Sequence, residues 1–201
     1  AGLAAGFLST WRKHGTAAPS RVRGAYSVVI VDASNKAVFL AVDRFAIQTL
    51  CYCIDGHMLT ISDRADCVEG RGTDLDPQAI FDYLFFHMIP APRTIFRNVR
   101  RIPAAHSLLI DEKGVEEIRH WPLHFDERHR EPFAAARDTF RNLIREGVAE
   151  EIAGHKRAGA FLSGGTDSST VAGVLNQVTG APAPAYSIGF EAEGYDEMEY
   201  A

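Results

Sequence analysis

The sequence predicts an α+β domain built from antiparallel hairpins, followed by the start of an α/β domain with a parallel sheet. Two observations predict this order. Pairs of β-rich runs joined by short turns recur between residues 26 and 118, which is the pattern of antiparallel strands. From residue 133 onward the pattern changes to helix, apolar strand, glycine-rich loop, helix and strand, which is typical of a parallel βαβ unit.

The first domain is expected to contain two helices and three hairpins. Asp76-Pro77 offers a helix start, with Asp as N-cap and Pro at the first helical position. Asp55-Gly56 is the signal for a type I′ hairpin turn. The expected helices cover residues 3–13 and a segment from Asp76 with the apolar stripe Ile80, Phe81, Leu84 and Phe85; the hairpins pair residues 26–31 with 37–41, 50–54 with 58–62, and 107–110 with 115–118.

A charged stretch bracketed by prolines, residues 122–132, separates the two patterns and predicts a linker. We therefore expect domains at residues 1–124 and 133–201, with the linker at 125–132. The second domain is expected to form a helix over 133–153, a strand over 158–162, a helix over 167–178 with Val171, Val174, Leu175 and Val178 on its buried side, and a strand over 185–188.

Composition excludes some classes of function. Apolar residues make up 46% of the chain and the net charge is −5, which suits a globular protein and gives no electrostatic reason to bind nucleic acid or an anionic membrane. No apolar run is long enough to cross a bilayer. Cys51, Cys53 and Cys67 are interpreted as reduced thiols of a cytoplasmic protein.

Two metal sites are weighed and not favoured. Cys51 and Cys53 share one face of a strand, but a free cysteine is more often a small core residue. Three histidines of the region around the linker are more simply part of a solvated charged stretch; they are His120, His124 and His129.

The segment that carries chemistry is the loop Ser163–Ser168, with the sequence Ser-Gly-Gly-Thr-Asp-Ser, between an apolar strand and a helix. Such a junction lies at the carboxyl edge of a parallel sheet, where ligands bind. Glycines let the backbone approach an anion closely, and the first N–H groups of the helix point toward it. Hydroxyl groups add donors, and Asp167 suits an anion site when Mg²⁺ joins it to phosphate oxygens.

The loop is distinct from two other phosphate loops. It lacks the Gly-Lys-Ser/Thr of a Walker A loop and the Gly-x-Gly-x-x-Gly of a dinucleotide site. The alternative is a purely structural turn in which Asp167 caps the helix that follows.

Residues 161–169 resemble the pyrophosphate loop of glutamine-dependent asparagine synthetases and their relatives. The relatives include β-lactam synthetases, lasso-peptide cyclases and amidotransferases of polysaccharide clusters. Residues 186–190 and 195–201 resemble the family's next strand and helix start, at a fitting distance from the loop. Asp196 with Glu199 fits a helix cap better than a substrate contact.

The resemblance extends into the first domain. Residues 22–27 loosely match the family's Leu-Arg-Gly-x-Phe-Ala, and residues 43–50 resemble its Asp-Arg-Phe-Gly-Ile-Lys-Pro-Leu. The second segment departs from the family at Ala46, Gln48 and Thr49.

The resemblance implies an N-terminal-nucleophile-like layer domain, followed by the start of an adenine-nucleotide-binding domain. It implies a glutamine-hydrolysing asparagine synthase, in which ATP converts the aspartate side chain to β-aspartyl-AMP and glutamine-derived ammonia displaces AMP. The implied partners are ATP, Mg²⁺, aspartate and glutamine or ammonia, and a homodimer is left open. The implied cofactor-binding residues are Leu162, Ser163, Gly164, Gly165, Thr166, Asp167, Ser168 and Ile188, with Asp167 also on Mg²⁺ and with Leu162 and Ile188 beside the adenosine.

The segment that resembles the glutaminase domain does not contain the family's nucleophile. The family uses a cysteine at the mature N-terminus, with its own amine as the base. The chain starts at Ala1, and its three cysteines do not match, so no glutaminase catalytic residue is identified. Both ends look cut, and a middle fragment of a longer protein is expected. Two other functions stay open: a relative that adenylates another carboxylate, from a lactam, peptide or polysaccharide pathway, and a non-catalytic interaction module.

Overall fold

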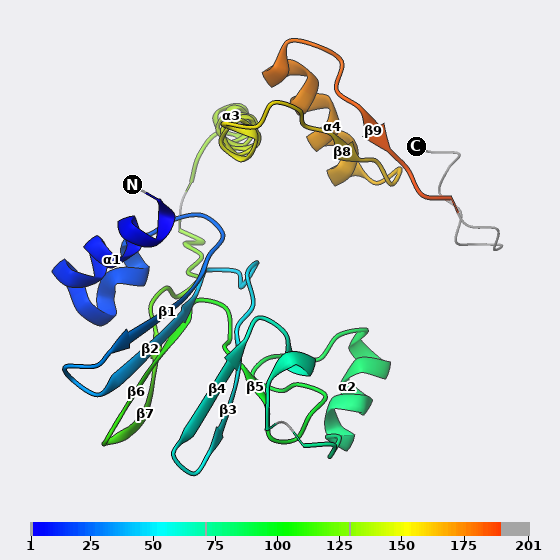
Figure 1. Cartoon of the computed structure of the whole chain (residues 1–201). Coiled ribbons are helices and arrows are strands. Elements are labelled where there is room, and N and C mark those ends of the chain that lie inside the picture. The colour runs from blue at the N-terminus through cyan, green and yellow to red at the C-terminus, as the bar shows by residue number, and fades with distance from the viewer. Residues whose placement is uncertain (1, 71, 129, 190–201) are drawn as a thin grey trace. The chain divides into compact units, whose positions relative to one another are not determined.

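The computed structural model describes residues 2–70, 72–128 and 130–189 (Figure 1). The chain divides into two compact units, Ala1–Phe125, here called unit 1, and Asp126–Ala201, called unit 2. Unit 1 is a mixed α/β structure with antiparallel sheets, as the hairpin pattern predicts.

Unit 1 contains the predicted hairpins, with boundaries close to those expected. Its helices are α1 (Leu3–His14) and α2 (Pro77–Phe86), with the short 3-10 helices η1 (Gly15–Arg21) and η2 (Ala65–Cys67). Its strands are β1 (Ser27–Asp32), β2 (Ala37–Val42), β3 (Cys51–Asp55), β4 (Met58–Ser62), β5 (Arg100–Arg101), β6 (His106–Asp111) and β7 (Gly114–Arg119).

The strands of unit 1 form two antiparallel sheets that share a core. One sheet has the order β1-β2-β6-β7 and the other the order β4-β3-β5. Leu40, Val42 and Leu108 of the four-stranded sheet pack with Leu50 and Ile102, and all five are buried. Alternation along each strand therefore separates a face toward this core from an outer face.

Helix α1 contacts the outer face of the four-stranded sheet. The rings of Trp11 and Phe39 lie 4.2 Å apart, and those of Phe7 and Tyr26 lie 5.4 Å apart. The helix is predicted correctly from its apolar spacing. Its first apolar residue nevertheless plays no part in the packing, because Leu3 is 96% exposed.

The β3–β4 hairpin corrects one predicted turn. Asp55 pairs with Met58, so the two loop residues are Gly56 and His57 rather than Asp55 and Gly56. Gly56 has a φ of 57°, whereas His57 is not among the residues with positive φ. A type I′ turn needs positive φ at both central residues, and a glycine alone in the first position is the type II′ pattern.

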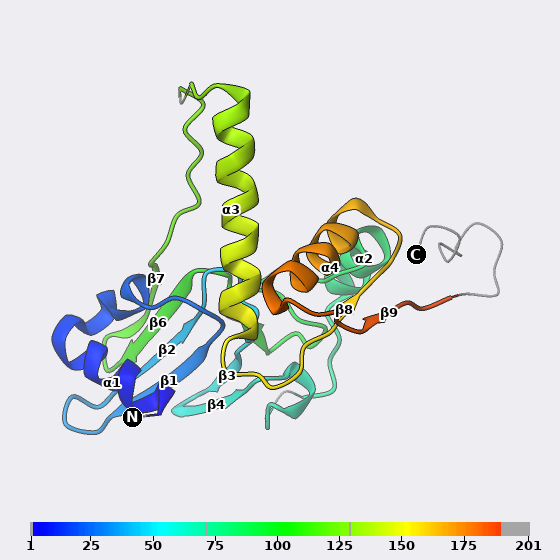
Figure 2. The ribbon, with the colours of Figure 1, turned by 90° about the horizontal axis from the view of Figure 1, so that it is seen from above.

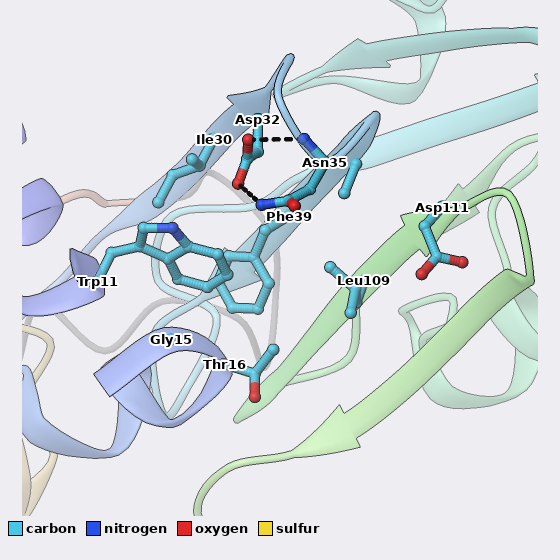
Figure 3. A pocket seen from close by; sticks show the side chains of 10 residues that line it. Trp11, Gly15, Thr16, Ile30, Asp32, Asn35, Phe39, Leu109 and Asp111 are labelled. Atoms are coloured by element: carbon cyan, nitrogen blue, oxygen red, sulfur yellow. Dashed lines mark hydrogen bonds between the residues drawn. The ribbon is translucent and has the colours of Figure 1, made fainter. Parts of the chain in front are cut away.

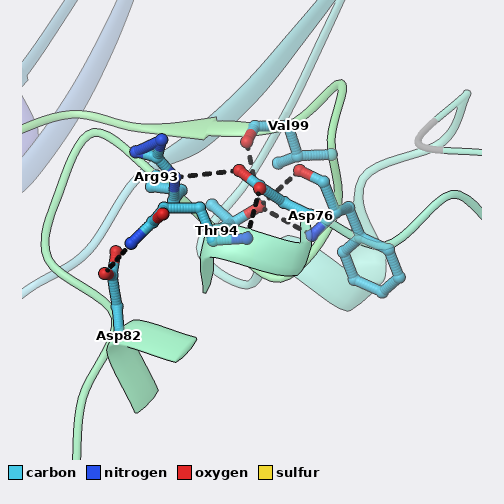
Figure 4. Close-up of polar contacts among 7 residues, drawn as sticks. Asp76, Asp82, Arg93, Thr94 and Val99 are labelled. Carbon is cyan, nitrogen blue, oxygen red and sulfur yellow. Dashed lines mark hydrogen bonds and ion pairs between the residues drawn. The ribbon is translucent and has the colours of Figure 1, made fainter. Parts of the chain in front are cut away.

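Helix α2 starts as predicted but exposes its apolar stripe. The Asp76 side chain accepts a hydrogen bond of 3.0 Å from the Gln78 N–H, and it forms an ion pair with Arg93 at 2.9 Å (Figure 4). Close by, the Thr94 hydroxyl donates to the Val99 carbonyl at 2.9 Å. The stripe is between 40% and 71% exposed; it consists of Ile80, Phe81, Leu84 and Phe85.

Unit 2 contains helix α3 (Phe133–Ile152), strand β8 (Ala160–Phe161), helix α4 (Thr166–Thr179) and strand β9 (Ala185–Tyr186). Figure 2 shows α3 side-on along its 20 residues. β8 and β9 pair in parallel, so the predicted βαβ unit is present. The predicted buried side of α4 is only partly right, because Leu175 is buried while Val171 is 44% exposed. A two-stranded sheet is too narrow to cover the whole helix face.

Candidate functional site

The loop Ser163–Ser168 lies at the carboxyl edge of the parallel strand pair. β8 ends at Phe161, the Leu162 N–H donates to the Tyr186 carbonyl at 2.8 Å, and α4 starts at Thr166. Gly164 is half-buried and Gly165 is exposed, so neither lies inside a packed interior. This is the position in an α/β sheet where ligands bind.

The N-terminus of α4 is not capped by a side chain. Its N-cap residue is Gly165, and the first helical bond runs from the Ser169 N–H to the Gly165 carbonyl at 3.1 Å. The N–H groups from Gly165 to Ser168 therefore have no partner within the helix. The alternative in which Asp167 caps the helix is wrong, because Asp167 lies inside the first helical turn.

The two glycines of the loop differ in conformation. Gly164 has a φ of 77°, in the region that favours glycine. Gly165 has a φ of −76° and a ψ of 156°, which any residue can adopt. A Cβ atom at Gly165 would meet nothing closer than the Ser163 Oγ, at 3.4 Å.

The Ser168 hydroxyl joins the two ends of the loop. Its Oγ accepts a hydrogen bond from the Ser163 N–H at 3.2 Å and donates to the Gly165 carbonyl at 3.1 Å. It also lies 3.0 Å from the Ser163 Oγ. The serines at both ends of the motif are therefore bonded to each other, a contact that the sequence spacing does not reveal.

Asp167 is exposed on the first turn of α4. Together with Ser168 it lines a cavity of about 410 Å³ in unit 2. The other walls are mostly apolar and come from α3, β8 and α4; they include Val148, Ile152, Phe161, Val171 and Leu175. Besides Asp167 and Ser168, Glu151 of α3 is the other polar side chain that lines this largely apolar cavity.

Two further predicted site residues lie at the strand ends. Leu162 is half-buried, and its N–H is used in the bond to β9, so only its other groups can meet a ligand. Ile188 follows β9 and is 67% exposed. Asp196, Glu199 and the matched segment 195–201 lie outside the described residues.

The metal alternatives gain no support from the described part of the chain. No group of three or more His, Cys, Asp or Glu residues in it could hold a metal ion. The His120 Nε2 donates to the Val42 carbonyl at 3.0 Å, and burial lowers the pKa of this imidazole. His129 lies outside the described residues.

The three cysteines are free thiols. Cys51 and Cys53 are buried in the core, as the core interpretation predicts, and Cys67 is exposed. Burial raises the pKa of Cys51, which keeps it in the unreactive thiol form.

A second cavity lies under α1 on the outer face of the four-stranded sheet (Figure 3). Its volume is about 270 Å³, and Trp11, Phe39 and Leu109 line it with the carboxyl groups of Asp32 and Asp111. Hydrogen bonds from Ser34 and Asn35 lower the pKa of Asp32 to about 2. Its carboxylate oxygens are thus already engaged in the turn between β1 and β2.

A buried polar network in unit 1 was not predicted. The Asp43 carboxylate is buried and accepts four backbone N–H groups, from Tyr26, Phe45, Ile47 and Gln48, at 2.9 to 3.2 Å. This network fixes the loop after β2, which is the segment 43–50 singled out above. Ala46, one of its departures, has a φ of 50°.

Two family models match the chain. Residues 6–121 match the glutamine amidotransferase domain, and residues 139–201 match asparagine synthase. No helix among the described residues is both long and apolar enough to cross a membrane.

Several known proteins are similar along most of the chain. It is 25% identical to glutamine-hydrolysing asparagine synthetase 1 of Bacillus subtilis, over 96% of this chain and 31% of that protein. It is 26% identical to a putative asparagine synthetase 2 of Methanocaldococcus jannaschii, over 96% of this chain and 39% of that protein. The amidase chyE of Penicillium rubens is 24% identical to it, over 84% of this chain and 25% of that protein.

Among solved structures, glutamine phosphoribosylpyrophosphate amidotransferase from B. subtilis aligns over 96% of this chain and 41% of that one. The sequence identity is 13% and the TM-score is 0.40. The chain spans 31% and 39% of the length of the two asparagine synthetases.

Proposed function

Since this chain belongs to the glutamine-dependent asparagine synthetase family, we propose that it forms part of an ATP-dependent ligase that makes an amide. In this proposal unit 1 belongs to the glutaminase-like domain, and residues 133–201 begin the ATP-binding domain. The substrates are ATP, aspartate and glutamine or ammonia. A cytoplasmic location and a homodimer stay predictions.

The observation that carries the proposal is the uncapped N-terminus of α4 at the carboxyl edge of β8 and β9. Four successive N–H groups without helical partners attract an anion, and the helix dipole adds to this attraction. Gly164 and Gly165 allow the backbone to come close to phosphate oxygens. The proposed ligands of the pyrophosphate are the residues Ser163, Gly164, Gly165, Thr166, Asp167 and Ser168.

Asp167 fits a magnesium ion that is held mainly by the nucleotide. Mg²⁺ in nucleotide sites is commonly bound by one or two carboxylates together with phosphates and water, and the exposed Asp167 supplies one carboxylate beside the anion site. When bound, the ion neutralises charge on the leaving pyrophosphate. Leu162 and Ile188 are proposed to border the adenosine through backbone groups.

The reaction follows from the chemistry of the carboxyl group. A carboxylate is a poor electrophile, so one of its oxygens first attacks the α-phosphorus of ATP and pyrophosphate leaves. Ammonia then attacks the carbonyl carbon of the acyl-adenylate, loses a proton, and AMP departs. The loop contributes by holding the pyrophosphate as negative charge accumulates on it.

A second candidate is a ligase that adenylates a different carboxylate. It is favoured by the departures at Ala46, Gln48 and Thr49, and by the similar identities to asparagine synthetases and to an amidase, 25% and 24%. For unit 1, the buried Cys51 is not a suitable nucleophile, and we assign no glutaminase catalytic residue to this chain.

The test uses the complete protein with ATP, Mg²⁺, aspartate and either ammonium chloride or glutamine. Pyrophosphate and asparagine are expected in equal amounts. Asp167→Asn is expected to lower pyrophosphate release by about 100-fold, because it removes one charged ligand of the ion. Glu146→Gln, which neutralises an exposed carboxylate on α3, is the control and should leave the rate unchanged.

Pyrophosphate release with another acid but not with aspartate would support the second candidate. Wild-type release in Asp167→Asn would contradict the proposed role of the loop.

A further inference from the structure

His120 fastens the chain beyond β7 to the rest of unit 1. Its backbone N–H donates to the Ala105 carbonyl at 2.9 Å, and its Nε2 donates to the Val42 carbonyl at 3.0 Å. Trp121 follows directly, and the Arg44 guanidinium lies 5.2 Å from the centre of its ring. These contacts hold the segment at the point where unit 1 leads toward the predicted linker.

The bond to Val42 determines which imidazole nitrogen carries a proton. A carbonyl oxygen only accepts, so the proton lies on Nε2 and the neutral His120 has none on Nδ1. Nδ1 is buried and has no hydrogen-bond partner among the described residues. A proton added there would therefore meet no acceptor, and a buried donor without an acceptor costs free energy. The bonded arrangement thus suits the neutral imidazole.

The surroundings of His120 also oppose a positive charge. Burial is the largest cause that lowers its pKa, and the charges of His106 and Arg44 lower this pKa further. Asp43 acts in the opposite direction, but its carboxylate already accepts four backbone N–H groups. The Glu117 carboxylate lies 3.7 Å from the His106 Nε2. The net result is a pKa of His120 below the usual histidine value.

We propose that His120 is a proton-sensitive latch for the chain beyond β7: the neutral side chain holds the segment on β2, and the protonated side chain releases it together with Trp121. A released His120 takes up a proton at the usual histidine pKa of about 6.5, whereas the bonded one resists protonation until a lower pH. Release is therefore favoured progressively as the pH falls below about 6.5.

The consequence concerns the connection between the two units. Release of His120 and Trp121 adds chain to the predicted linker, so a longer tether joins the units in acid than at neutral pH. The inference goes beyond the proposed function and does not depend on it, because neither the 163–168 loop nor a substrate takes part.

Hydrogen exchange of the His120 N–H in the complete, ligand-free protein tests the latch. Exchange is measured from about pH 7.5 to about pH 5.5, on either side of the usual histidine pKa, and each rate is divided by the rate of an unstructured peptide at the same pH. The protection of this N–H in the wild type is expected to fall about 10-fold over this range. Amides of β1 and β2 should keep their protection, because the latch opens without unfolding of unit 1.

Variants separate His120 from the other titrating groups. His120→Gln keeps an N–H donor for the Val42 carbonyl but cannot become charged, so its protection should not depend on pH. His124→Gln, at an exposed position of the same segment, is the matched control and should behave as the wild type. His106→Asn keeps a donor for the Ala104 carbonyl and removes a charge that opposes His120, so this variant should lose less protection in acid.

The fluorescence of Trp121 gives a second readout in the 201-residue chain, in a Trp11→Phe background that leaves Trp121 as its one tryptophan. The emission should move to longer wavelengths over the same pH range, because the ring leaves the contacts with Arg44 and Phe45. Adding His120→Gln should abolish the shift.

Three results would overturn the proposal. The same acid loss of protection in His120→Gln as in the wild type would assign it to another group. Unchanged protection in the wild type would mean that His120 stays bonded in acid. A loss shared by β1 and β2 would be acid unfolding of the whole unit. If His120→Gln lacked protection even at about pH 7.5, an equal acid loss in His106→Asn and the wild type would decide against the latch. Pyrophosphate release tests the proposed function separately.

Discussion

The N–H of His87 donates a hydrogen bond of 2.8 Å to the carbonyl oxygen of Tyr83 and closes the last turn of α2. His87 itself adopts a left-handed conformation with a φ of 57°, which ends the helix. Glycine adopts this conformation without the steric cost that a Cβ atom brings.

His87→Gly is therefore expected to stabilise unit 1 by about 0.5 to 1 kcal/mol. Denaturant unfolding of the 201-residue chain, followed by tryptophan fluorescence, reports on unit 1 because Trp11 and Trp121 are its two tryptophans. Leu84→Gly, exposed in the interior of the same helix, should instead destabilise by about 1 kcal/mol. The same sign for both substitutions would contradict the explanation.

The buried Asp43 carboxylate gives a pH-dependent prediction. Burial raises its pKa, but the four backbone N–H donors outweigh burial, and the pKa lies below its usual value. Its stabilising effect is therefore complete above the usual Asp pKa and is lost as the pH falls through the lowered value.

Asp43→Asn should destabilise unit 1 by about 2 to 3 kcal/mol at pH 7, since one amide oxygen cannot replace a carboxylate that accepts four bonds. It should also flatten the dependence of unfolding free energy on pH in the acid range. Asp55→Asn, at an exposed strand end, is the matched control. If the unfolding free energy of Asp43→Asn depended on acid pH as steeply as that of the wild type, another group would be the cause of that dependence.

Gly159 and Gly173 form a matched pair in unit 2. A Cβ atom at Gly159 would lie 2.9 Å from the Pro184 carbonyl oxygen and 3.0 Å from the Tyr186 ring, whereas one at Gly173 on α4 meets nothing within 4 Å. Gly159→Ala should destabilise unit 2 by about 1 to 3 kcal/mol. Gly173→Ala should stabilise it by up to about 1 kcal/mol.

Hydrogen exchange of the α4 amides measures both variants, because the tryptophans do not report on this unit. Equal exchange in Gly159→Ala and the wild type would mean that β8 and β9 can separate to admit the methyl group without loss.

The sequence predicts the local elements of this protein well, because the features that specify them are close together along the chain. Alternation and turn residues predict the hairpins, and Asp76-Pro77 predicts the start of α2. The β3–β4 turn was wrong by one residue, since the register depends on pairing across the whole hairpin.

Features that depend on distant residues could not be predicted. Asp43 is bonded to Tyr26 across 17 positions, and nothing in either segment indicates that the carboxylate is buried. Likewise, the motif predicts where the 163–168 loop lies, but the bond between Ser163 and Ser168 depends on the three-dimensional path of the loop.

The most direct test of the pyrophosphate loop is ATP–pyrophosphate exchange by the complete protein with its carboxylate substrate. Gly165→Ala, which the fold has room for, is expected to lower exchange at least about 100-fold, because the methyl group blocks the approach of phosphate to the backbone. The loss of stability should stay within about 1 kcal/mol, since alanine is a poorer N-cap than glycine. Exchange at the wild-type rate in Gly165→Ala would contradict the account.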